Sequence, residues 1–182
     1  MSPSPSTLKP RSAKRTDLRT FQNELVSRMM APATTEGVES QLGFVAGDER
    51  WLCRLPHTEE VLVPPPITPV PLTRPWFLGL TNVRGNLYSV VDFSSFLGKP
   101  LLVHNADTRL LLLSRATGAI NAALLVQRVY GLRSVKSFAP TGQGTQDKAW
   151  VLQHWMDADG STWHEMDLSK LVQDSEFQHI GR

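Results

Sequence analysis

The 182-residue chain is 41% hydrophobic and 20% charged, with a formal net charge of +2 and one cysteine, Cys53. This length suffices for one core or two small ones, the single cysteine excludes an intramolecular disulfide, and no apolar run approaches the roughly 18 residues of a membrane-spanning helix. With no secretory signal at its start, the chain is expected in the reducing cytoplasm, without direct insertion into a membrane.

The positive charge is concentrated at the N-terminus. Residues 1–20 carry five Lys/Arg and one Asp, which leaves 14 basic and 16 acidic groups in residues 21–182. A nucleic-acid-binding module has a concentrated positive face, and the larger part of this chain is slightly acidic. The charge distribution therefore argues against nucleic acid as a partner.

The N-terminal region is expected to have two parts. Residues 1–15 are rich in Ser and Pro with few apolar side chains, which predicts a disordered lead because such a segment cannot offset its ordering entropy. Residues 16–40 are expected to form an amphipathic helix, capped by Thr16 and ending before Pro32, and a connector. Its apolar residues recur at helical spacing: Leu18, Phe21, Leu25, Val26 and Met29. Such a helix packs on the domain's own surface or docks on a partner.

After this connector the pattern becomes typical of β structure. "QLGFVAGDERWLCRL" has two short apolar runs around Gly47-Asp48, a dipeptide that favours a hairpin turn. "EEVLVPPP" predicts a third strand, which ends at three prolines. Three strands within about thirty residues indicate a sheet that closes early.

A central strand is expected at "GNLYSVVDF", because both of its faces are mostly apolar. One face carries Leu87, Ser89 and Val91, and the other carries Tyr88, Val90 and Asp92. The following "SSFLGKP" predicts a short helical turn that ends at Gly98.

The second half of the chain adds more short strands. Apolar runs predict strands at 109–114, 121–126 and 129–137, followed by a glycine-rich loop at 141–147. Asp159-Gly160 is a second strong hairpin signal, between two further strands. Many short strands with few helices between them favour a mainly β protein built of small barrels over a doubly wound sheet.

The side chains that could take part in catalysis or bind a metal ion form no recognisable motif for either. The five histidines lack the closely spaced pairs of a zinc site: His57, His104, His154, His164 and His179. "HEMD" at 164–167 is expected to be strand and helix cap, and "DADG" at 157–160 a turn. Cys53 lies in an apolar strand, where a thiol is usually inert. We therefore expect no catalytic residue, no metal and no cofactor.

Arg84 is the one charged residue in the apolar stretch between Gly79 and Gly85. A guanidinium keeps its charge, so an arginine in such surroundings needs either a carboxylate partner or an exit to solvent. The acids at the edge of an earlier strand are Glu59 and Glu60, and alternation places them on opposite faces. The two glycines are expected to provide positive φ or close backbone approach.

The segment "GLTNVRGNLYSVVDFSSFLGKP" resembles the signature of the CheW family, in which G-[VI]-x-N-[LV]-R-G leads into a strand of the type P-[VI]-[VI]-D-L and a turn ending L-G. The matching positions are Gly79, Asn82, Val83, Arg84, Gly85, Val90, Val91, Asp92, Leu97 and Gly98. The resemblance runs from about residue 41 to about residue 171. The family usually has other residues at four places in this chain, Thr58, Ser89, Phe93 and Gln127. With its extra N-terminal helix, the chain resembles the PilI-type branch of type IV pilus chemosensory systems.

This resemblance implies a fold, partners and contact residues. The fold would be two intertwined five-stranded SH3-like β-barrels over residues 41–182, with an extra N-terminal helix. The protein would be an adaptor that contacts the cytoplasmic tip of a methyl-accepting chemoreceptor and the regulatory domain of a CheA-type histidine kinase, in receptor arrays at the membrane of the cell pole. Glu60 would form a structural ion pair with Arg84. The implied partner-binding residues are Thr58, Glu60, Leu62, Gly79, Asn82, Arg84 and Gly85.

Two alternatives remain open at this point. The chain could be a small β-barrel enzyme or ligand-binding domain with an unrecognised site. It could also be an SH3-like module that binds proline-rich ligands, although its own "VPPPITPVP" run is better explained as a rigid internal connector.

Overall fold

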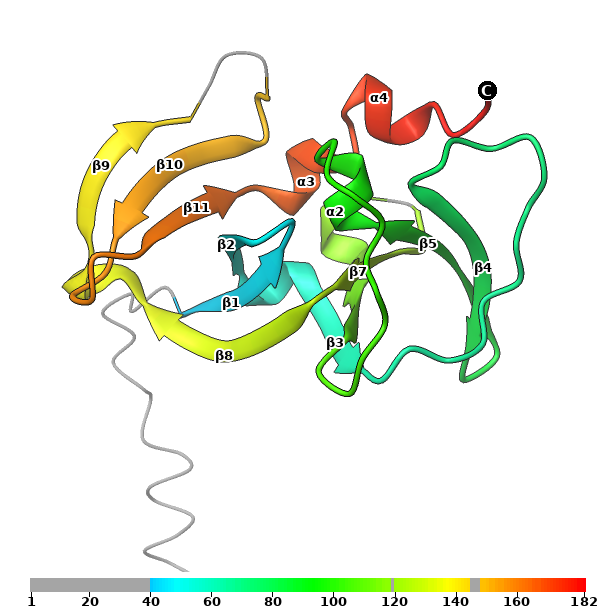
Figure 1. The fold of residues 1–182 in the computed structure, drawn as a ribbon, viewed down its shortest axis with the longest axis horizontal. Helices are drawn as coiled ribbons and strands as arrows, with labels where there is room; N and C mark the ends of the chain where they lie inside the picture. Colours follow the sequence, from blue (N-terminus) through cyan, green and yellow to red (C-terminus); the bar gives the residue numbers. More distant parts are fainter. Residues whose placement is uncertain (1–39, 119, 145–147) are drawn as a thin grey trace, which may run out of the picture. The chain divides into compact units, whose positions relative to one another are not determined.

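The computed structural model describes residues 40–118, 120–144 and 148–182 (Figure 1). The predicted lead at 1–15 and the predicted helix that follows it lie outside the described residues. Two β-sheets are the main regular structure of the described chain, as the sequence predicted for a mainly β protein. Short helical turns connect or cover them.

The first sheet has six strands in the order β8-β1-β2-β11-β10-β9. These strands are β1 (Ser40–Ala46), β2 (Glu49–Arg54), β8 (Arg128–Ser134), β9 (Ala139–Gln143), β10 (Val151–Met156) and β11 (Thr162–Met166). The second sheet has five strands in the order β3-β6-β7-β5-β4. They are β3 (Thr58–Leu62), β4 (Phe77–Val83), β5 (Asn86–Asp92), β6 (Arg109–Leu113) and β7 (Ala122–Val126).

The two sheets are interleaved along the chain. The chain makes β1 and β2, leaves to build the whole second sheet, and returns to complete the first sheet. Parallel pairing of β2 with β11 and of β5 with β7 joins segments that are far apart in sequence. This connectivity agrees with the predicted pair of intertwined SH3-like units, the first of which has one strand more than the predicted five.

Helical turns are short. They are α2 (Phe93–Phe96), α3 (Leu168–Leu171), α4 (Ser175–Gln178) and three 3₁₀ turns, η1 (Leu55–His57), η2 (Arg115–Thr117) and η3 (Val135–Ser137). Asp167 caps α3 by accepting hydrogen bonds from the backbone N–H groups of Ser169 and Lys170, so "HEMD" is strand and cap, as predicted.

Tight turns set the register of the predicted hairpins. Gly47 and Asp48, with φ of 61° and 62°, join β1 to β2 as the Gly-Asp signal predicted. At the β10–β11 turn, one carboxylate oxygen of Asp157 accepts hydrogen bonds from the N–H groups of Asp159 and Ser161 at 3.0 and 2.8 Å. This confirms the predicted turn at 157–160.

The prediction of a glycine-rich loop at 141–147 is wrong for residues 141–143, which belong to a strand. Ala139–Gln143 forms the edge strand β9, which pairs antiparallel with β10. All five residues are exposed, so the strand lacks the apolar alternation by which strands are recognised. A Cβ atom at Gly144 would lie 1.7 Å from the carbonyl oxygen of Val151, so a glycine here permits the close approach of two strands.

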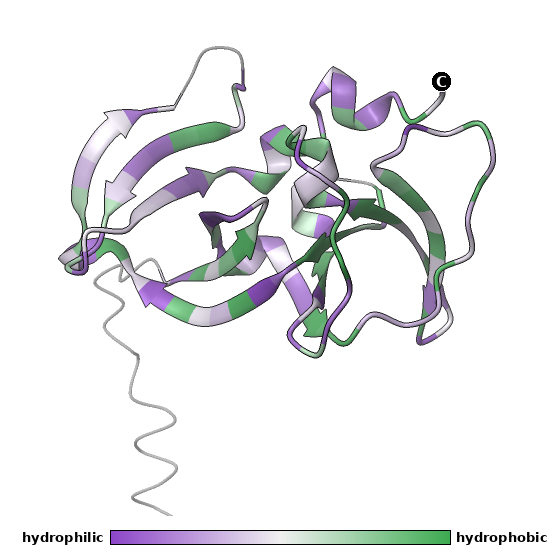
Figure 2. Cartoon of the chain, in the orientation of Figure 1, coloured by the Kyte–Doolittle hydropathy of each residue, from purple (hydrophilic) through white to green (hydrophobic). Residues whose placement is uncertain are grey.

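One large hydrophobic core joins both sheets and the helical turns. A smaller cluster occupies the other face of the second sheet and includes Tyr88, Val90 and Leu110. β5 lies between β7 and β4, with Val91 in the large core and Tyr88 and Val90 in the small cluster, so the predicted central strand and its two faces are confirmed. Figure 2 shows the hydrophobic colouring concentrated on β4 and β7 and weak on β9.

Asp92 is a buried carboxylate that fixes the end of β5. Its side chain is 1% exposed, and its two oxygens accept hydrogen bonds from the N–H of Ser95 at 3.0 Å and of Leu102 at 2.7 Å. The first bond caps α2, and the second ties the loop after α2 back onto the sheet. Asp92 therefore fixes the direction in which the chain leaves β5.

We expect Asp92→Ala to lower the free energy of unfolding by about 2–4 kcal/mol, because it leaves two N–H groups without their acceptor in a buried place. Urea denaturation followed by tryptophan fluorescence measures the loss. Asp92→Asn keeps one acceptor oxygen and should lose less. Equal losses for the two variants would contradict this account of Asp92.

Gly79 marks the closest backbone approach beside β4. It has φ of +130°, and a Cβ atom there would lie 2.0 Å from the carbonyl oxygen of Thr68. Thr68 exchanges two backbone hydrogen bonds with Leu80, at 2.8 and 2.9 Å. The segment that follows the prolines is thereby held against β4.

Gly79→Ala should destabilise the fold by at least about 3 kcal/mol, because backbone must move to admit the methyl group. Gly98→Ala is the matched control, since Gly98 also has positive φ (+80°) but no atom lies within 4 Å of the place that its Cβ would occupy. Its strain alone costs about 1 kcal/mol. Thermal or urea unfolding measures the loss of stability in both variants. Equal losses would mean that the close approach of Thr68 to Gly79 does not limit the residue at position 79.

Candidate functional site

Arg84 lies at the tip of the β4–β5 hairpin. Arg84 and Gly85 form its two-residue turn, with φ of 52° and 87°, between the paired residues Val83 and Asn86. Positive φ at both positions gives a turn whose twist matches that of the strands, although a non-glycine residue pays about 1–2 kcal/mol for it. The side-chain oxygen of Asn82 accepts a hydrogen bond from the N–H of Gly85 at 2.9 Å. The "NVRG" segment thus builds a rigid turn that presents Arg84.

Arg84 forms an ion pair with Glu60. Its Nη2 atom lies 2.7 Å from Oε1 of Glu60, and the two side chains are 76% and 31% exposed. In the sequence Arg84 stands in an apolar stretch, whereas in the structure the turn carries its guanidinium out into solvent. An exposed pair of this kind contributes only about 0.2–1 kcal/mol to stability. Its geometry therefore matters more for the surface that it creates than for the fold.

A second contact joins the same two segments. The buried hydroxyl of Tyr88 on β5 donates a hydrogen bond to Oε2 of Glu59 at 3.3 Å. Burial raises the pKa of Tyr88, and the charge of Glu59 raises it further. β3 and β4 are the two edges of the second sheet, so the side chains of Glu59 and Glu60 link β3 to the hairpin without strand pairing. The sequence did not indicate this role for Glu59.

The remaining predicted contact residues do not all lie at the hairpin tip. Gly79 fixes the backbone of β4, as described above. The hydroxyl of Thr58 lies 3.6 Å from the sulfur of Cys53, and Leu62 packs against the small hydrophobic cluster. The structure therefore brings together Glu60, Asn82, Arg84 and Gly85, while Thr58 and Leu62 lie at the two ends of β3.

A surface hollow adjoins the hairpin. It has a volume of about 460 Å³ and lies between the proline segment and the β4–β5 hairpin; its lining includes Pro65, Thr68, Leu80, Asn82 and Leu87. Leu87 is 55% exposed. Asn82 lines the hollow and also caps the turn that carries Arg84, so the hollow adjoins the ion pair through this residue. We call this region the hairpin surface: Glu60, Asn82, Arg84, Gly85 and Leu87 with the prolines that line the hollow.

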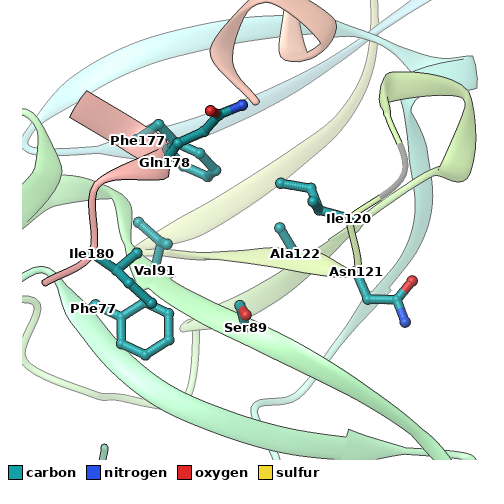
Figure 3. A pocket seen from close by; sticks show the side chains of 9 residues that line it. All are labelled: Phe77, Ser89, Val91, Ile120, Asn121, Ala122, Phe177, Gln178 and Ile180. Carbon is teal, nitrogen blue, oxygen red and sulfur yellow. The ribbon is translucent and has the colours of Figure 1, made fainter. Parts of the chain in front are cut away.

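Figure 3 shows a second, more apolar pocket of about 210 Å³. Phe77 and Val91 come from the second sheet, Phe177 and Ile180 from α4 and the residues after it, and Ile120 from the segment before β7. This pocket could not be predicted from the sequence, because α4 has too few residues for a periodic signal.

The described residues show little of the chemistry of an active site. No group of three or more His, Cys, Asp or Glu side chains in the described ranges is arranged for a metal ion. Burial raises the pKa of Cys53 to about 12, so this thiol stays protonated and unreactive, as predicted. Among the helices in the described ranges, none has the length and apolar character needed to cross a membrane.

Comparison with known proteins gives a consistent result. The family model of the CheW-like domain matches residues 40–176. The protein PilI of Pseudomonas aeruginosa is 32% identical over 104 residues, which cover 56% of this chain and 57% of PilI. The chemotaxis protein CheW of Helicobacter pylori is 33% identical over 76 residues, which cover 42% of this chain and 46% of that protein. The chain thus spans about half the length of the curated relatives it matches.

The solved structures add a match in fold. The scaffolding protein TtCheW from Thermoanaerobacter tengcongensis superposes with a TM-score of 0.63 at 21% identity, over 76% of this chain and 94% of that one. The family match covers both sheets described above, including the hairpin with Arg84. The chain therefore belongs to the family of proteins with a CheW-like domain.

Proposed function

We propose that this protein is a non-enzymatic adaptor that couples a methyl-accepting chemoreceptor to a CheA-type histidine kinase, in a chemosensory pathway that controls type IV pilus twitching motility. Membership of the CheW-like family supports the adaptor role, and the likeness to PilI supports the pilus-linked branch. It would act in the cytoplasm, recruited to membrane-associated receptor arrays at the cell pole.

The exposed Glu60–Arg84 pair is the observation that carries this proposal. An ion pair with a 76% exposed arginine does little for stability, yet a strained turn, the Asn82 cap and a carboxylate from β3 all hold it in one geometry. A fixed charge pattern beside a hollow with an exposed leucine is suited to recognising a protein surface. We assign the hairpin surface, with Thr58 and Leu62 on the adjoining strand and Gly79 as its backbone support, to partner binding.

An adaptor of this kind needs no catalytic group. It changes kinase activity by contacting receptor and kinase together, so that the receptor's conformation shifts the population of kinase states. The shift is limited by the difference in contact free energy between those states. A rigid protein transmits such a difference better than a flexible one, and the shared core of the two sheets provides that rigidity.

The ligand-binding alternative has less support. The hollow beside the hairpin has about 460 Å³, within the roughly 300–1,000 Å³ of typical small-molecule sites, but it lies on the surface that we assign to partner binding. The apolar pocket of Figure 3 has about 210 Å³, below that range. It is large enough for one apolar side chain or a small fragment.

We expect Arg84→Ala to weaken the ternary complex with receptor and kinase by at least about tenfold while leaving the free energy of unfolding within about 0.5 kcal/mol. Co-sedimentation with a purified receptor cytoplasmic fragment and the kinase regulatory domain from the same organism measures the complex. Lys99→Ala is the matched control. Lys99 forms an exposed ion pair with Glu49, in which Nζ lies 3.3 Å from Oε1, and neither residue belongs to the β4–β5 hairpin. An intact ternary complex with the Arg84 variant would count against the adaptor proposal.

A charge exchange tests the pairing itself. Glu60→Arg alone should impair coupling, because it places two cations side by side, and Glu60→Arg combined with Arg84→Glu should recover part of the loss. Binding measured for the two single variants and the double variant gives the coupling energy of the pair. Strictly additive effects would mean that the two side chains act independently.

A further inference from the structure

Two histidines that are ten residues apart in sequence face each other across the β10–β11 ladder. His154 and His164 are direct cross-strand partners. Their Nδ1 atoms are 2.7 Å apart, and the ring planes are nearly perpendicular at 88°. The sequence spacing matched no metal motif, since the contact depends on the register of the hairpin. Two ring nitrogens, each of a type that binds metal ions, are thus held next to each other.

This pair lies in the interior of the first sheet. β10 and β11 are flanked by β9 and β2, and the turn between them is held by Asp157. The ring of His164 also packs against Trp51, with ring centroids 5.0 Å apart. The backbone that carries both imidazoles is therefore fixed before any ligand binds.

The surroundings favour a neutral imidazole at His164. Burial lowers the pKa of His164, and the neighbouring His154 lowers it further, while Glu49 acts in the opposite direction. The Glu49 carboxylate is itself paired with Lys99. The neutral form of imidazole is the one that binds metal ions.

We propose that His154 and His164 form a binding site for a divalent transition-metal ion, with Cu²⁺ or Ni²⁺ preferred over Zn²⁺. The two Nδ1 atoms are the protein ligands, and water completes the coordination, because no third His, Cys, Asp or Glu in the described part of the chain is arranged to join them. The site is independent of the hairpin surface and of the proposed adaptor function.

The geometry decides which metal fits. With metal–nitrogen bonds of about 2.0–2.1 Å, two imidazole nitrogens are about 2.9 Å apart at a right angle and about 3.3 Å apart at the tetrahedral angle. The 2.7 Å of the hydrogen-bonded pair must open less to reach the right-angled arrangement of tetragonal Cu²⁺ and Ni²⁺ sites than to reach the tetrahedral one. The general order of metal affinities also places Cu²⁺ first.

Proton balance at the pair is simple. In the absence of metal, one neutral ring donates its Nδ1–H to the Nδ1 lone pair of the other ring. Metal binding requires both lone pairs, so the donor ring takes its proton on Nε2 instead. No net proton is released when a metal ion binds to two neutral rings, because the proton moves from Nδ1 to Nε2 of the same ring.

Titration of the tag-free, full-length chain with CuCl₂, followed by calorimetry and by electron paramagnetic resonance, tests this site. We expect one Cu²⁺ with nitrogen coordination from two imidazoles. His154→Ala and His164→Ala should each weaken binding by at least about tenfold, because each removes one of two protein ligands. NiCl₂ should bind more tightly than ZnCl₂ in parallel titrations.

The matched control is His104→Ala, since His104 is an exposed histidine in a loop of the second half. It should bind Cu²⁺ as the unaltered chain does. Circular dichroism separates ligand loss from unfolding, and His164→Gln provides a second polar variant should His164→Ala fail to fold. Cu²⁺ binding that survives in the His154→Ala variant, or a spectrum with one imidazole nitrogen, would overturn the proposal, and so would the absence of binding by the unaltered chain.

Discussion

The packing around Phe93 is the constraint on which the rest of the structure depends. This fully buried ring follows the central strand β5 and contacts Phe44 and Trp51 of the first sheet as well as Trp150 before β10. Aromatic pairs at these separations add about 0.5–1.5 kcal/mol each beyond the area that they bury. Because Asp92 immediately precedes Phe93 and is itself buried and bonded, side-chain packing and backbone direction are fixed at the same place. The two sheets therefore cannot shift independently.

This shared core explains how a small β protein can present a precise surface with little regular helix. The hairpin that carries Arg84 is anchored at its base by buried residues of β4 and β5, among them Phe77, Val90 and Val91, so its tip has little freedom even though Arg84 is exposed. Stability and recognition are separated in this arrangement: the ion pair contributes little to folding, whereas Gly79 and the core contribute nothing directly to the surface charge. The proposed adaptor role benefits from that separation, because residues of the hairpin surface can change without loss of the fold.

Local signals in the sequence predicted much of this structure. Gly47-Asp48 and Asp159-Gly160 indicated hairpins because such dipeptides tolerate positive φ, and the motif around Arg84 indicated the family. Contacts that depend on register or on distant segments were missed. His154 and His164 meet only because the hairpin aligns them. Strand β9 was missed because it is exposed along its length, contains Gly142 and has no apolar alternation. The apolar pocket needs α4, which is too short to predict from periodicity.

Strand β9 has a consequence for how this protein can assemble. It lies at the outer edge of its sheet, where unpaired backbone groups could recruit a strand from another molecule. Pro140 lacks the N–H that such β-augmentation requires, and a register shift between His154 and Trp155 distorts the ladder next to it. The edge is thus poorly suited to strand addition, which hinders copies of this chain from joining into one continuous sheet through β9.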